Sequence, residues 1–118
     1  MTIRALLLVL TCLLLVVSAA QSQQPLTPAQ TAFLKAETHK ADKRFVQRVS
    51  VIVGVKEPVV QKAMPEKGRI TDPVARLIAA LEHTTGKPLT EDNKTQIRAA
   101  DEERQQAVSA AEIAARTK

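Results

Sequence analysis

One stretch, from Thr71 to Gly86, limits the fold of this chain most strongly because it carries both the start and the stop signals of a helix. Asp72 stands where an N-cap residue belongs, and Pro73 follows at the first helical position, where a missing N–H costs nothing. Gly86 supplies the left-handed residue that ends helices, and Pro88 keeps the helix from resuming. An apolar stripe runs between these signals and consists of Val74, Leu77, Ile78 and Leu81. A helix of about 12 residues is marginal alone, so we expect neighbouring helices to pack on it.

Residues 1–20 have the pattern of a cleavable secretory signal peptide. Arg4 forms the positive start, residues 5–17 form the apolar centre, and Ser18-Ala19-Ala20 forms a small-residue cleavage site. The alternative is an uncleaved anchor, but the apolar run is shorter than the roughly 20 residues that span a bilayer. Export to the periplasm or secretion is therefore expected.

Cleavage after Ala20 removes Cys12, the chain's one cysteine. No disulfide can then stabilise the mature protein in an oxidising compartment, so helix packing must hold it together. With two phenylalanines and no tryptophan or tyrosine, its core is expected to be aliphatic and rich in alanine. We expect a disordered leader over residues 21–26 and a single helical domain over 27–118.

The first helix is expected over residues 27–53. Thr27, Pro28 and Gln30 complete a capping box with proline at the first helical position. One sector of this helix is apolar apart from Thr38 and contains Leu34, Ala41, Phe45, Val49 and Ile52. Residues 49–55 alternate valine with other residues and would also suit a strand, but no convincing partner strand exists. We therefore interpret them as the helix end, near Gly54.

Residues 56–71 are expected to be a long, mobile connection, because Pro58, Pro65 and Gly68 interrupt them. One helical turn docking on the core can form there from Val59, Val60, Ala63 and Met64. Connections of this length are often functional, which makes this one a place to look for a partner.

The last helix is expected over residues 90–115, with Thr90 as its N-cap and acidic residues in its first turn. Its predicted seam is shallow and consists of Ile97, Ala100, Ala107 or Val108, Ala111 and Ala114. The acidic cluster Asp101-Glu102-Glu103 falls outside this seam, so we expect it to be a solvated face.

Catalytic and metal chemistry find little support in the sequence. His39 and His83 stand alone, without metal-ligand spacing, and neither lies on a predicted apolar stripe. The chain has no phosphate loop, dinucleotide fingerprint or nucleophile elbow. We expect a protein that is not an enzyme and that uses no cofactor or metal.

Charge divides unevenly along the chain. Residues 35–69 hold nine lysines and arginines against four acids, whereas residues 90–118 hold five against six. Lys40, Lys43, Arg44 and Arg48 share one side of the first helix and are the candidate partner-binding residues. Such a surface attracts an acidic protein patch, a polysaccharide or an anionic membrane, although charge runs are more often merely solvated faces. Nucleic acid is not an expected partner, because the chain lacks an aromatic stacking platform.

Two five-residue segments that open predicted helices are similar to each other. Leu26-Thr27-Pro28-Ala29-Gln30 and Leu89-Thr90-Glu91-Asp92-Asn93 resemble the LTxxQ motifs of the Spy/CpxP family, with Asn93 in place of the second glutamine. That family consists of small, exported, all-helical periplasmic proteins implicated in envelope stress and in chaperoning unfolded clients. The resemblance implies a cradle-like helical homodimer with a basic concave face.

These observations predict an all-α domain of three main helices, over residues 27–53, 72–85 and 90–115. The expected function is that of an exported binding protein, chaperone-like or acting in envelope stress. One alternative is an inhibitor or immunity protein for a single enzyme, and another is a helical protein associated with the membrane surface.

Overall fold

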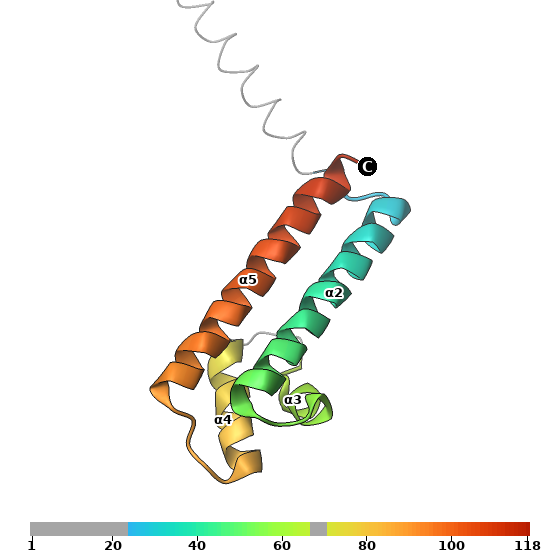
Figure 1. The fold of residues 1–118 in the computed structure, drawn as a ribbon. Helices are drawn as coiled ribbons and strands as arrows, with labels where there is room; N and C mark the ends of the chain where they lie inside the picture. The colour runs from blue at the N-terminus through green and yellow to red at the C-terminus, as the bar shows by residue number, and fades with distance from the viewer. Residues whose placement is uncertain (1–23, 67–70) are drawn as a thin grey trace, which may run out of the picture.

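The computed structural model describes residues 24–66 and 71–118, which form four helices and contain no strand (Figure 1). The helices are α2 (Pro28–Val53), α3 (Glu57–Ala63), α4 (Pro73–Thr85) and α5 (Glu91–Arg116). The predicted all-α class is confirmed. The predicted signal peptide, at residues 1–20, lies outside the described residues.

The two longest helices lie side by side and antiparallel, and they determine the shape of the described part of the molecule (Figure 1). The shorter helices α3 and α4 pack at the end where α2 finishes and α5 begins. No helix within the described residues combines the length and the apolar character needed to cross a bilayer.

Local hydrogen bonds place the helix ends within one residue of their predicted positions. Thr27 accepts from the Gln30 amide at 3.2 Å, and the Gln30 side chain accepts from the Thr27 amide at 2.9 Å, which completes the capping box. Asp72 caps α4 through the Ala75 amide at 3.0 Å. Gly54 and Gly86 end α2 and α4 at φ of 75° and 69°, where an L side chain would be strained.

The ambiguous segment at residues 49–55 is helical as far as Val53. Val49 is fully buried, whereas Val51 is 83% exposed, as a helical rather than an alternating arrangement requires. The β-branched residues suit a strand intrinsically, but helix packing on one face overrides this preference.

The predicted mobile connection contains a helix, so the prediction of three helices falls one short. In α3, Pro58 lies in the first turn, where its missing N–H breaks no bond, and so it helps the helix begin instead of interrupting it. Val60 faces the core and is 0% exposed, which agrees with the predicted docking of this segment. Residues 67–70 of the connection lie outside the described residues.

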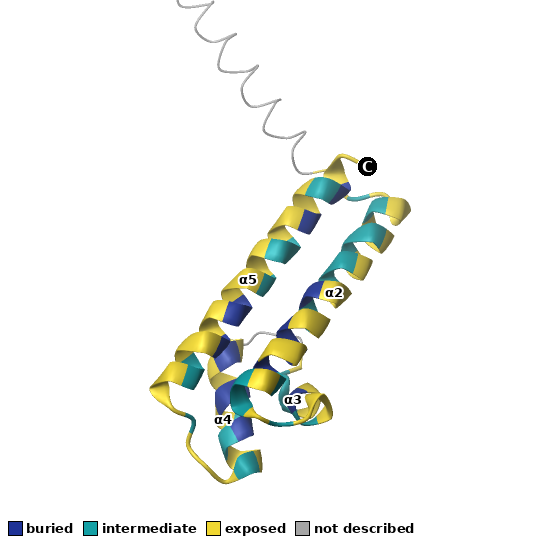
Figure 2. Ribbon diagram, viewed as in Figure 1, coloured by how far each residue is buried: buried dark blue, intermediate teal, exposed yellow. Residues whose placement is uncertain are grey.

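One hydrophobic core occupies the end of the molecule where all four helices meet (Figure 2). Its members come from every helix and are Phe45, Val46, Val49, Val60, Val74, Leu77, Ile78, Leu81, Ile97 and Ala100. Toward the other end, α2 and α5 pack on each other, and the described residues that are buried there are alanines: Ala41, Ala111 and Ala115. The predicted seam had Ala114 in place of Ala115, but Ala114 is half-buried.

Candidate functional site

The four candidate basic residues are all exposed on α2, but the structure turns them toward different neighbours. Lys40 pairs with Glu37 of the same helix at 2.9 Å. Lys43 faces α3, where it lines a depression of about 620 Å³ together with His39 and Glu57. Arg44 and Arg48 instead face α5. The shared face predicted from the sequence is therefore divided into separate sites.

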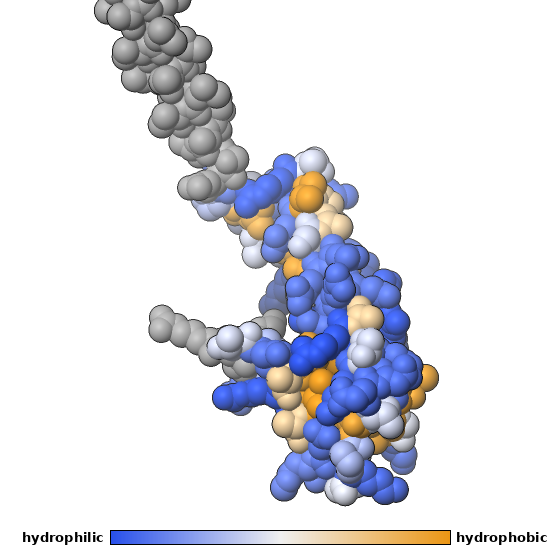
Figure 3. Space-filling model, turned by 90° about the vertical axis from the view of Figure 1, so that its left-hand side faces the viewer, coloured by the Kyte–Doolittle hydropathy of each residue, from blue (hydrophilic) through white to orange (hydrophobic). Residues whose placement is uncertain are grey.

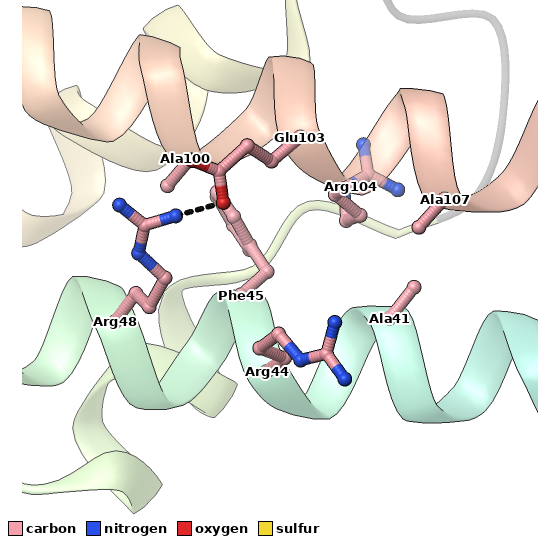
Figure 4. Close-up of a pocket in the computed structure, with 8 residues that line it drawn as sticks. All are labelled: Ala41, Arg44, Phe45, Arg48, Ala100, Glu103, Arg104 and Ala107. Atoms are coloured by element: carbon pink, nitrogen blue, oxygen red, sulfur yellow. Dashed lines mark hydrogen bonds and ion pairs between the residues drawn. The ribbon is translucent and has the colours of Figure 1, made fainter.

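Arg44 and Arg48 line two adjoining hollows between α2 and α5. The smaller, of about 30 Å³, has alanines on both helices and is the one drawn in Figure 4. The larger, of about 540 Å³, is bordered by Val51 and Ile52 of α2 and by Ala99 of α5. We call the two together the arginine cleft, lined by Ala41, Arg44, Phe45, Gln47, Arg48, Val51, Ile52, Gln96, Ala99, Ala100, Glu103, Arg104 and Ala107.

One ion pair crosses the arginine cleft. Arg48 donates to the carboxylate of Glu103 on α5, and Figure 4 shows the two side chains reaching toward each other. Their side chains are 42% and 60% exposed, so water screens the pair. Pairs of this kind contribute roughly 0.2–1 kcal/mol to stability. Arg48 is therefore held loosely.

Arg44 supplies the second cation of the arginine cleft. Within the described residues it has neither an ion-pair partner nor a hydrogen-bond partner for its guanidinium. A guanidinium presents a planar fork of donors that matches the two oxygens of a carboxylate. Arg44 is thus free to bind an acidic group that reaches the cleft.

Arg104 also borders the smaller hollow, but its charge is already used inside the protein. It donates to Asp101 at 2.6 and 3.0 Å and to Asp42 at 3.3 Å. Its guanidinium also lies 5.5 Å from the centre of the Phe45 ring, within the range of a cation–π contact. Gln105 donates to the remaining Asp101 oxygen at 2.7 Å. Arg104 therefore joins α2 to α5 and is not available to a ligand.

The burial of Asp101 corrects the expectation that its acidic cluster is a solvated face. Asp101 is only 8% exposed, whereas Glu102 and Glu103 are exposed. The buried position of Asp101 can be predicted from residues that alternate at intervals of four and three, since this spacing marks the seam between paired helices. The residues of α5 at that spacing are Ile97, Asp101, Arg104, Val108, Ala111 and Ala115. The sequence analysis did not single out Arg104, and it gave no sign that Glu103 lines a cleft.

The two histidines lie apart from the arginine cleft. His39 and His83 are both exposed, as expected. His39 lines the depression between α2 and α3, which also contains Asp42 and Glu57. Across the part of the chain that the structure describes, no three histidine, cysteine, aspartate or glutamate side chains are placed to hold a metal ion.

Comparisons of the chain with protein-family models, with curated proteins and with solved structures found no match.

Proposed function

We propose that this chain is an exported helical protein that binds flexible or unfolded segments of other proteins, in the manner of a chaperone-like envelope factor. The observation that carries the proposal is the arginine cleft, where Arg44 and Arg48 line the same hollow as the 83%-exposed Val51. Cations beside an exposed apolar side chain suit segments that mix acidic and apolar residues. The signal-like residues 1–20 and the LTxxQ-like segments support the periplasm or secretion as the setting.

The side of the molecule drawn in Figure 3 favours weak and broad binding over one tight interface. Figure 3 shows a side of the molecule on which hydrophilic residues dominate and hydrophobic ones form separate patches. Val51 and Ile113 are the large hydrophobic residues most exposed among those described, and they lie near the C-terminal ends of different helices. Stable partners usually bury a continuous apolar centre, which this pattern does not offer.

The experiment measures how well the chain prevents the aggregation of several unrelated unfolded proteins at low salt. We expect suppression that weakens as salt is added, because the Debye length falls from about 10 Å at 0.1 M to about 3 Å at 1 M salt. Replacing Arg44 and Arg48 by glutamine should remove most of the effect. The matched control replaces Lys40 and Lys43 by glutamine, which removes the same charge from the same helix outside the cleft.

If the two double variants lose aggregation suppression equally, the arginine cleft has no special role, and a general basic surface explains the binding. If the chain is instead an inhibitor or immunity protein, a pull-down from an envelope extract should yield one stoichiometric partner, and the chain should suppress no aggregation. Sedimentation with anionic vesicles tests the membrane-surface alternative, which predicts binding without any protein client. Sedimentation equilibrium tests whether the chain forms a homodimer.

A further inference from the structure

The ion pair between Arg48 and Glu103 has the chemistry of a ligand complex formed within the chain. The carboxylate of Glu103 on α5 binds the guanidinium of Arg48 on α2 across the arginine cleft. Arg44 lines the same hollow, with its guanidinium extended along α2 toward Ala41 (Figure 4). We propose that Arg48, with Arg44 one helical turn away, forms a carboxylate-binding site. Glu103 occupies Arg48 in the free protein, and an acidic side chain of a bound protein segment takes its place. This inference rests on the proposed function and names the chemical group that the site recognises.

Glu103 is held in a way that allows exchange. Among the described residues, the Glu103 side chain makes one hydrogen bond or ion pair, the contact with Arg48, and it is 60% exposed. Asp101, two residues earlier, differs in both respects, because it is buried and accepts from Arg104 and Gln105. An incoming carboxylate would meet the same guanidinium as Glu103 does, so the exchange replaces one pair by an equivalent one.

The larger hollow beside the pair indicates what kind of carboxylate the site takes. It adjoins Arg44 and Arg48 and is bordered by Val51, Ile52 and Ala99, so a side chain placed there touches apolar groups. A segment with a glutamate or aspartate next to an apolar residue can place its carboxylate at Arg48 and its apolar side chain in the larger hollow. The charged headgroups of a membrane lie in one plane and present no apolar side chain beside the charge. A protein segment therefore fits this site better than a membrane surface does.

The test measures the affinity of the full chain for a labelled peptide, blocked at both ends, that alternates glutamate with leucine. Glu103→Gln removes the internal competitor, and Glu102→Gln removes the same charge from a residue that is not in the cleft. Because an exposed pair contributes little, we expect roughly two- to five-fold tighter binding for Glu103→Gln. Glu102→Gln should change the affinity by less than that. A second peptide, with glutamine in place of glutamate, should bind weakly to every variant.

The outcomes separate this inference from the proposed function. Equal tightening by Glu103→Gln and Glu102→Gln overturns the exchange, since net charge alone would explain it. Equal binding of the glutamine peptide overturns the recognition of a carboxylate. Unchanged peptide binding after the double replacement of Arg44 and Arg48 by glutamine overturns the carboxylate site. If neither peptide binds to any variant and no unfolded protein is protected from aggregation, the proposed function itself is wrong. Circular dichroism of each variant checks that the helices remain intact.

Discussion

Asp101 and Arg104 acquire a structural role on α5 because both face another helix, α2. Both occupy seam positions at which an apolar residue would be usual, and they satisfy each other there. Arg104 also reaches Asp42 of α2, so a polar contact joins the two long helices at the edge of the hydrophobic core. A buried charge is tolerated in a fold when it is paired and hydrogen-bonded, as Asp101 is here.

Replacing Arg104 by methionine is expected to lower the free energy of unfolding by about 1–3 kcal/mol, because the buried Asp101 loses its cation. Urea denaturation measures the change. The control is Arg98→Met, since Arg98 pairs with Asp72 at 3.6 Å on an exposed surface, and it should cost less than about 1 kcal/mol. Adding Asp101→Leu to the Arg104 variant should recover stability, because an apolar pair can replace a buried ion pair. No recovery would contradict this account.

The helix α3 shows how a short element can depend on tertiary contacts. It has seven residues, too few to form a stable helix alone, and its N-cap Lys56 provides no side-chain hydrogen bond. Its stability must come from docking, through the fully buried Val60, on the core formed by the other helices. The same dependence explains why the sequence indicated a turn of helix here but not a complete element.

Truncating Val60 to alanine is expected to cost about 2 kcal/mol of stability, through lost burial and a residual cavity. Val51→Ala is the matched control, because it removes the same atoms from a side chain that is 83% exposed, and it should leave stability nearly unchanged. Thermal unfolding followed by circular dichroism compares the two. Similar melting temperatures would show that α3 does not depend on this contact.

At the scale of the whole molecule, packing is concentrated at one end. All four helices contribute to the core around Leu77 and Leu81. Among the described residues, those buried at the far end of the α2–α5 pair are alanines (Figure 2). Two further contacts connect the last residues of the chain to the segment around the start of α2. Arg116 donates to the Gln24 carbonyl at 3.0 Å, and the Lys118 ammonium lies 4.9 Å from the Phe33 ring centre. These contacts are exposed and weak.

We therefore expect local opening to begin at the far end of the helix pair. Native-state hydrogen exchange should show faster exchange for the amides of residues 32–38 and 109–115 than for those of 45–51 and 97–103, since buried contacts set the local stability. All four ranges are helical, so helix formation alone would protect them alike. Uniform protection across the four ranges would contradict a stability gradient.

The sequence alone determined the all-α class and the ends of the three longer helices. It could do so because these features are local. Helical periodicity gives the class, Gly54 and Gly86 end two helices, and the helix starts depend on bonds between residues three apart, such as Thr27 with Gln30, Asp72 with Ala75 and Thr90 with Asn93. Helical periodicity likewise placed the candidate basic residues on one helix. Their role in binding stays a prediction.

Only the tertiary structure decided which of these residues form a site. Arg48 meets Glu103 across 55 positions of the chain, and Arg104 meets Asp42 across 62. No local pattern links such pairs, because their contact depends on the register in which α2 and α5 pack. That register turned Arg44 and Arg48 toward α5, left Lys43 facing α3, and buried Asp101 while its neighbour Glu102 stayed in water.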